Sequence, residues 1–426
     1  MNNDNPSAAA LLDRIDLAQD DSRIVETISL MFKASDYHQL LVSFQGDATQ
    51  PPPERAIKFA DALNKALGYN DVDAETHNRI LRALRRTCAE VGILPSSYYL
   101  DENQMKKITD VPFASGGYSD VWRGLYKGEN VSIKAFRVYM TDNVKQLTKA
   151  WCKEMVVCQS LSHPNVLSFL GVVSTASLPL CIVSKWMKNG NISEFLKRDG
   201  QFDRRPLLID IARGLNYLHS LEVVHGDLKG PNILIDDNNN AVLCDFGLAS
   251  ITADAESAHA STVNSAGSIR WMAPERLSIF DGSSEPAPTS VRVTKESDMY
   301  SLAMVVIEVF TGTSPFSDIA DAGVIIKLSQ NKRPQKPEGA FQLGLTDPIW
   351  GTVEMCWKTR PLDRPTATDV LEIWEKEING GGVPAIREQG GRRLSRILSG
   401  FSAGIKSKGT PWSKFVCGGS GEQYAQ

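Results

Sequence analysis

Two short loop sequences carry charged and amide side chains at spacings that suit phosphate chemistry. The first runs from His225 to Asn232 as His-Gly-Asp-Leu-Lys-Gly-Pro-Asn, and after a short apolar segment the chain reaches Asp245-Phe-Gly247. One carboxylate can orient a hydroxyl nucleophile, while a second carboxylate and an amide can hold Mg²⁺ against phosphate oxygens. Together the two loops predict phosphoryl transfer.

An upstream segment could bind a polyphosphate. Residues Phe113 to Val121 form a turn of small residues, in which backbone N–H groups can approach phosphates closely, although a plain hairpin turn is the alternative. The strand that follows holds Lys134 among apolar neighbours, and a lysine there needs a charge partner. Glu154, in the next helical segment, is the candidate partner.

The elements that must position these residues change in character along the chain. From about Lys107, strand-like segments alternate with glycine-containing turns, and beyond residue 190 helical patterns dominate. The predicted strands cover 122–126, 131–136 and 180–184, and the predicted helices cover 192–197, 206–220, 297–310 and 347–356. Asp347 is expected to cap the last helix, with Pro348 at its first position. This order predicts an α+β architecture with a β-rich small lobe and a helical large lobe.

The first hundred residues show helical spacing throughout. Gly68 and Gly92 follow two of these periodic segments as stop signals. The prolines of 51–53 separate the first of the two from a weaker helical run between Leu11 and Phe44. Residues 1–105 are therefore predicted to be an α-helical N-terminal region and a candidate partner-binding module.

At this point the chain resembles the eukaryotic protein kinase superfamily over residues 107–378. The resemblance rests on the order of a glycine loop, a lysine, a glutamate, the His225–Asn232 loop, Asp245-Phe-Gly247 and Ala273-Pro-Glu275. It implies a bilobal protein-kinase fold, with an N-lobe to about residue 187, ATP in the cleft and protein substrates.

The resemblance assigns roles to individual side chains. Lys134 holds the α- and β-phosphates and pairs with Glu154, and Asp227 is the catalytic base. Lys229 contacts the γ-phosphate, and Asn232 and Asp245 hold Mg²⁺, with Mn²⁺ as an alternative. The implied nucleotide contacts are Ala114, Ser115, Gly116, Gly117, Ser119, Val121, Ser132, Lys134, Ser184, Lys185, Met187, Leu234 and Asp245.

Further implied roles concern the adenine pocket and the scaffold. Ser184 is a small gatekeeper, and Trp186 with Met187 walls the pocket or packs in the core. Asp298 anchors the catalytic loop. Arg364 is expected to pair with Glu275, and removing one partner of such a buried pair costs about 3–5 kcal/mol.

The branch within the superfamily follows from two sets of residues. Lys229, two positions after the base, is typical of Ser/Thr kinases, whereas Trp271-Met-Ala-Pro-Glu and Cys356-Trp357 resemble the tyrosine-kinase-like branch. A Ser/Thr protein kinase on that scaffold is the leading interpretation. The alternative is a pseudokinase or nucleotide-binding signalling scaffold that acts through its helical N-terminal region.

Four positions depart from the family pattern. Ala114 and Ser119 replace the outer glycines of the phosphate loop, Ser132 replaces an alanine, and Gly226 replaces the arginine before the base. That arginine normally receives the phosphate of the activation loop. We therefore expect activity to depend only weakly on phosphorylation of the nearby hydroxyl residues, Ser261, Thr262 and Ser265.

Composition excludes several other classes of protein. The formal net charge is −4, so no overall basic field argues for nucleic acid. The most apolar run, from Leu302 to Phe310, is short and contains Glu308, which excludes a transmembrane segment. Seven cysteines without paired spacing predict reduced thiols and a cytoplasmic location, with the nucleus as an alternative. The basic tail, 379–426, is expected to be flexible and is a candidate for weak membrane contact.

Overall fold

The structure is a computed structural model, which describes residues 6–15, 21–34, 37–44, 54–69, 72–109, 111–115, 119–137, 144–174, 180–198, 202–246, 267–277 and 293–378. Gly116, Gly117, Gly247, the three hydroxyl residues at 261, 262 and 265, and the tail lie outside these residues. None of the described helices is long and apolar enough to cross a membrane.

The described residues of the N-terminal part form five helices, and the periodicity predicted that this part is helical. The helices are α1 (Ala8–Ile15), α2 (Asp21–Met31), α3 (Tyr37–Ser43), α4 (Glu54–Leu67) and α5 (Ala74–Val91). Asp73 caps α5 by accepting a hydrogen bond from the backbone of Thr76. Gly92 ends the helix at a φ of +79°, a conformation that a residue with a Cβ adopts at a cost.

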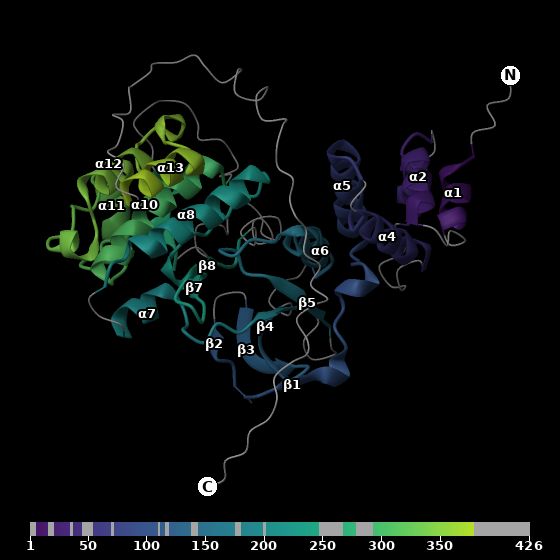
Figure 1. The fold of residues 1–426 in the computed structure, drawn as a ribbon, viewed down its shortest axis with the longest axis horizontal. Coiled ribbons are helices and arrows are strands. Elements are labelled where there is room, and N and C mark those ends of the chain that lie inside the picture. Colours follow the sequence, from purple (N-terminus) through teal and green to yellow (C-terminus); the bar gives the residue numbers. More distant parts are fainter. Residues whose placement is uncertain are drawn as a thin grey trace, which may run out of the picture. The chain divides into compact units, whose positions relative to one another are not determined.

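The second part is an antiparallel sheet with one helix beside it. Its strands are β1 (Met105–Lys107), β2 (Ala114–Ser115), β3 (Ser119–Tyr126), β4 (Glu129–Phe136), β5 (Phe169–Val173) and β6 (Cys181–Lys185). They are ordered β1-β3-β4-β6-β5, with β2 also paired to β3. Helix α6 (Val144–Ser160) lies between β4 and β5 in the chain (Figure 1). The β-rich small lobe is thus confirmed.

Alternation along β4 decides which of its side chains face the cleft. Val131, Ile133 and Ala135 are buried in the small core of the sheet. Ser132 and Lys134 point to the opposite face, because successive side chains of a strand alternate. The Lys134 side chain therefore lies on the cavity face of β4, and the apolar side chains lie on the other face.

The third part is helical, as predicted. It contains α7 (Ile192–Arg198), α8 (Arg205–Ser220), α10 (Lys295–Thr311), α11 (Asp321–Ser329), α12 (Asp347–Cys356) and α13 (Ala367–Ile378), with a hairpin of β7 (Ile233–Ile235) and β8 (Ala241–Leu243) (Figure 1). Helix α10 is buried from Ser297 to Phe310 and lies in the centre of the large hydrophobic core.

One predicted helix cap was wrong by a residue. Thr346, rather than Asp347, is the N-cap of α12, and its side chain makes no capping hydrogen bond. Asp347 instead pairs with Lys336 at 2.5 Å. Proline is placed within the first turn, where its missing N–H costs nothing.

The N-terminal helices share one hydrophobic core with α6. Helix α5 packs against α6, and the cluster that contains Phe59, Leu84 and Cys88 also contains Trp151 and Met155. Trp151 and Met155 are 3 % and 0 % exposed. The helix that carries Glu154 is thus covered by the N-terminal region, while the predicted boundary at residue 105 stays a prediction.

A chain that begins at residue 105 is expected to lose thermal stability and solubility, because its α6 would expose this apolar face. Each such side chain contributes roughly 1.5–3 kcal/mol when it is buried. Thermal unfolding and sedimentation of the shortened and full chains would measure the effect. Polar replacements of Trp151 and Met155 in the shortened chain should restore solubility; an unchanged melting temperature on shortening would contradict the shared core.

Candidate active site

A cavity of about 400 Å³ lies between the sheet and the helical part. It gathers most of the predicted nucleotide contacts, namely Ala114, Val121, Ser132, Lys134, Ser184, Lys185, Met187, Leu234 and Asp245. Ser115 and Ser119 lie in neighbouring strands β2 and β3 without lining it. The cavity therefore has the composition expected of a nucleotide pocket, with an apolar wall and a few charged groups.

Aromatic side chains stand at one edge of this cavity. The Phe113 ring meets the Trp186 ring edge-on with their centroids 4.9 Å apart, and the Arg123 guanidinium lies 5.4 Å from the centre of the indole. Trp186 and Met187 both line the cavity, which favours the wall that was expected over the packed core. Ser184 is buried at its back.

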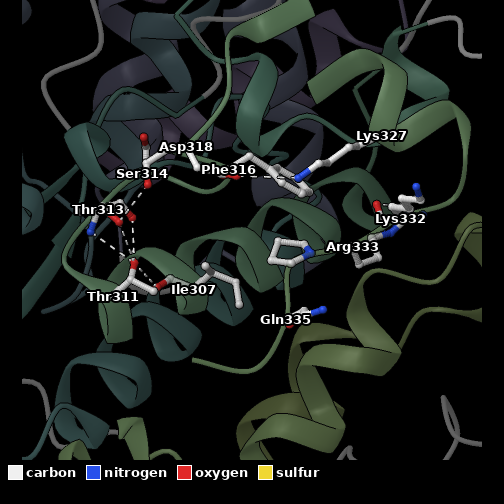
Figure 2. Close-up of a pocket in the computed structure, with 12 residues that line it drawn as sticks. Ile307, Thr311, Thr313, Ser314, Phe316, Asp318, Lys327, Lys332, Arg333 and Gln335 are labelled. Atoms are coloured by element: carbon white, nitrogen blue, oxygen red, sulfur yellow. Dashed lines mark hydrogen bonds and ion pairs between the residues drawn. The ribbon is translucent and has the colours of Figure 1, made fainter. Parts of the chain in front are cut away.

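A second cavity, of about 490 Å³, lies in the helical part between α10 and α11. Figure 2 shows Lys327, Lys332 and Arg333 on one side of it and Thr311 with Thr313 on the other. It contains none of the residues that the sequence assigns to phosphoryl transfer. The candidate active site is therefore the cavity beside the sheet.

Asp298, in the first turn of α10, anchors the catalytic loop, which comprises residues 225–232. Its carboxylate accepts hydrogen bonds from the backbone N–H groups of His225 (2.7 Å) and Gly226 (2.9 Å) and contacts the His219 ring nitrogen at 2.9 Å. Thr294 and Ser297 form a capping box that fixes this end of the helix. The anchoring role that was expected of Asp298 is confirmed.

Asp227 is surrounded by donors that fix its orientation. The Asn232 amide donates to the Asp227 carboxylate at 3.0 Å and to its backbone carbonyl at 2.8 Å. The Lys229 ammonium lies 2.8 Å from the same carboxylate and also donates to the Ser268 hydroxyl at 2.7 Å. The predicted base, the lysine and the amide are therefore brought together on one loop.

Lys134 and Asp245 form an ion pair across the cavity, with 2.6 Å between the ammonium and the carboxylate. Burial alone would raise the pKa of Asp245, but Lys134 and, more weakly, Lys229 hold it below its ordinary value. Asp245 also has a φ of +61°, a strained conformation that is typical of functional sites.

The structure pairs Lys134 with Asp245, and the expected ion pair of Lys134 with Glu154 stays a prediction. The physical reason for the pair with Asp245 is that a carboxylate in a poorly hydrated cleft requires a cation, and Lys134 supplies it. Glu154 is buried on α6 and stays a predicted partner.

Glu308 is a buried carboxylate beside the catalytic loop, and its contacts were not predicted from the sequence. It lies at the centre of α10, and its carboxylate accepts hydrogen bonds from the Gly230 backbone (3.0 Å), the Trp271 indole (2.9 Å) and the Ser193 hydroxyl. Burial raises the pKa of Glu308. A carboxylate within the apolar run 302–310 was the available signal, because such a group must find donors.

Replacing Gly230 by alanine is expected to destabilise the protein by about 1–3 kcal/mol and to lower kcat, because the added Cβ would overlap the Glu308 carboxylate and the Ser193 hydroxyl. Thermal unfolding and steady-state kinetics would measure both effects. Gly351→Ala is a matched control, since a Cβ there meets nothing within 4 Å and α12 gains a better helix former. Equal stability of the two variants would contradict the packing argument.

The expected pair of Arg364 and Glu275 is present as two parallel hydrogen bonds. The two guanidinium nitrogens of Arg364 lie 2.6 and 2.8 Å from the carboxylate oxygens. Arg364 also donates to the carbonyls of Lys358 (2.9 Å) and Glu296 (2.8 Å). The buried Arg364 guanidinium therefore connects Glu275, in the turn after Ala273, with Glu296 at the start of α10.

The residues present fit a divalent metal held with a nucleotide. The Asn232 amide nitrogen is engaged by Asp227, which leaves the amide oxygen as an acceptor, and Asp245 supplies a carboxylate. Among the described residues no cluster of three or more His, Cys, Asp or Glu could hold a metal. One carboxylate and one amide suit Mg²⁺, which keeps several waters and shares its other positions with phosphates.

These features define a class of protein. The site contains a base that is held by an amide and a lysine. It also contains a second lysine that is paired with a carboxylate across the cavity beside the sheet. Phosphoryl transfer from a nucleotide requires these groups. With the β-rich and helical lobes around them, they define a phosphotransferase with the protein-kinase fold.

Comparison with known proteins identifies the family. The model of the family described as protein tyrosine and serine/threonine kinase matches residues 109–373, so the chain belongs to this family. The chain is 30 % identical to serine/threonine-protein kinase STY17 of Arabidopsis thaliana over 312 residues, which are 72 % of this chain and 50 % of STY17. The predicted resemblance to the kinase superfamily and its tyrosine-kinase-like branch is confirmed.

Two further Arabidopsis thaliana relatives agree with this. Serine/threonine/tyrosine-protein kinase HT1 is 28 % identical over 62 % of this chain and 64 % of its own length. Serine/threonine-protein kinase CTR1 is 29 % identical over 79 % of this chain and 38 % of its own length. The chain thus spans about two-thirds or less of each of these relatives.

Proposed function

We propose that this protein transfers the γ-phosphoryl group of ATP to serine and threonine hydroxyls of protein substrates, with Mg²⁺ as the metal. The observation that carries the proposal is the contact of Asp227 with Lys229 and Asn232 beside a cavity that contains Lys134 and Asp245. The relatives' names, which include serine/threonine-protein kinases, support the same reaction.

The chemistry assigns a separate task to each group. Asp227 accepts a hydrogen bond from the substrate hydroxyl and takes its proton as the oxygen attacks phosphorus. Lys229 and Lys134 offset the charge of the transferred and the remaining phosphates. Asn232 and Asp245 would hold Mg²⁺, which neutralises the phosphate oxygens when it is bound. Asp298 keeps the loop in place while the proton moves.

Preference for serine and threonine is supported by Lys229 itself, two positions after the base, and by the names of the relatives. The Lys229 ammonium joins Asp227 to Ser268 at 2.8 and 2.7 Å, so the base and the turn before Ala273 are linked by one cation. Sequence analysis did not assign Ser268, because nothing near it in the chain indicates a contact with Lys229.

The pseudokinase alternative gains no specific support. The charged groups that the reaction needs are present among the described residues of the cleft. The N-terminal helices bury part of their apolar surface against α6. A partner protein would therefore bind to the remaining faces of these helices. A cytoplasmic location and protein partners of these helices remain proposals.

Phosphoamino-acid analysis tests the specificity. Purified protein would be incubated with labelled ATP, Mg²⁺ and a generic protein substrate, and the labelled products hydrolysed to amino acids. We expect phosphoserine and phosphothreonine, with a higher rate in Mg²⁺ than in Mn²⁺. Label in phosphotyrosine alone would contradict the Ser/Thr assignment, and rates that are independent of added metal would contradict the metal assignment.

A further inference from the structure

The residue before the catalytic carboxylate has no side chain of its own. Gly226 has a φ of +79°, and its N–H donates to Asp298 at 2.9 Å. Its carbonyl accepts a hydrogen bond from the guanidinium of Arg276 at 2.7 Å. The Arg276 guanidinium, from a distant segment, therefore contacts the peptide next to Asp227. The loop itself has no cationic side chain at position 226.

The charges of three carboxylates act on the Arg276 guanidinium. Arg276 follows Glu275 in the turn Pro274–Leu277, and its guanidinium is attracted by the charges of Asp227, Asp298 and Glu275. Its Nε is buried and has no hydrogen-bond partner among the described residues. Burial lowers the pKa of Arg276, so holding the charge there has a cost, and attraction to three carboxylates offsets part of this cost.

We propose that Arg276 is a positioning residue for Asp227 and supplies the cation that the arginine before the base supplies in related kinases. It holds the Gly226 carbonyl, and through that peptide it orients the carboxylate that faces the substrate hydroxyl. This inference rests on the proposed kinase function.

The arrangement also agrees with the expectation that activity depends only weakly on phosphorylation. An arginine on the catalytic loop needs an anionic partner, and a phosphate on the activation loop can be that partner. Arg276 already donates to the Gly226 carbonyl, and the charges of three carboxylates favour its cation. The guanidinium and the loop are therefore held together without an added phosphate.

The test compares arginine variants in the full chain. Arg276→Met is expected to lower kcat for phosphate transfer by about 10- to 100-fold, because small displacements of a catalytic group have effects of this size. The KM for ATP should stay within about twofold, since Arg276 does not line the nucleotide cavity. Arg276→Lys should recover part of kcat, because it keeps the charge beside Gly226.

Arg270→Met is a matched control from the same segment. Arg270 donates to the carbonyls of Pro315 and Ile319 and pairs with Asp321 at 2.9 Å, but it makes no contact with the catalytic loop. It should therefore lower the melting temperature without the selective loss of kcat. A comparable fall of kcat in both variants would overturn the proposal, as would an unchanged kcat in Arg276→Met.

Misfolding of Arg276→Met and absence of kinase activity in the unmodified protein are distinguished by further variants. If Arg276→Met fails to fold, Arg276→Lys and Arg276→Gln decide: a higher kcat for the lysine variant supports the cation, and equal values overturn it. If the unmodified protein transfers no more phosphate than Lys134→Met, the kinase function itself has failed, which the comparison of arginine variants alone would not show.

Discussion

Replacing Asp227 by asparagine should lower kcat by about 10²- to 10⁴-fold, the range that a positioned general base contributes. The amide keeps the shape of the side chain and can still accept a hydrogen bond from Asn232, so the loop should stay folded. It cannot take the proton of the substrate hydroxyl, and it loses the ion pair with Lys229. Steady-state kinetics at saturating ATP and substrate measures the effect.

Asp237→Asn is the matched control for this variant. Asp237 is a surface carboxylate that lies 3.3 Å from Lys188, and 46 % of its side chain is exposed. The same chemical change at this position should leave kcat within about twofold, because exposed ion pairs contribute little. If Asp227→Asn retained the kcat of the unmodified protein, Asp227 would not be the base.

The largest effect on stability is expected from Arg364→Met. The guanidinium side chain is 0 % exposed, and its loss would leave the Glu275 carboxylate and two backbone carbonyls without their donor. Removing one partner of a buried pair costs about 3–5 kcal/mol. Because 32 % of the Glu275 side chain is exposed, water can compensate in part, and we expect the lower end of this range.

Thermal or urea unfolding of Arg364→Met would measure this loss. Arg360→Met is the control, because Arg360 is 79 % exposed and only 3.9 Å from Asp363, so its removal should change the free energy of unfolding by less than about 0.5 kcal/mol. Similar losses in both variants would show that the pair with Glu275 does not stabilise the fold.

Local patterns predicted most of the elements that position the site. The alternation along β4 placed Lys134 in an apolar strand, and Gly68 and Gly92 marked the ends of α4 and α5. The apolar run of α10 was visible as well, with Glu308 inside it. Such features depend on residues that are close in sequence, so the chain itself shows them.

Contacts between distant segments could not be predicted in this way. Ser268 is bonded to Lys229, and Arg276 is bonded to Gly226, 50 residues away. Neither residue has a neighbouring pattern that marks it. Glu154 was the predicted partner of Lys134, and the contact of Lys134 with Asp245 was found only in the structure.

The shared core of α6 and the N-terminal helices was also hidden from the sequence. Trp151 and Met155 repeat at helical spacing, which predicts an apolar face but not what covers it. Since Glu154 lies on the same helix, the N-terminal region contributes to the position of a predicted active-site residue. The truncation at residue 105 examines this contribution directly.

The central claim is that the cleft residues catalyse transfer of phosphate from ATP. The most direct measurement is incorporation of labelled phosphate into a generic Ser/Thr substrate by the purified protein, with Asp245→Asn and Lys134→Met run in parallel. Both variants remove one member of the ion pair at 2.6 Å. We predict incorporation by the unmodified protein well above both variants; equal background in all three, with binding of ATP and Mg²⁺ intact, would contradict the account.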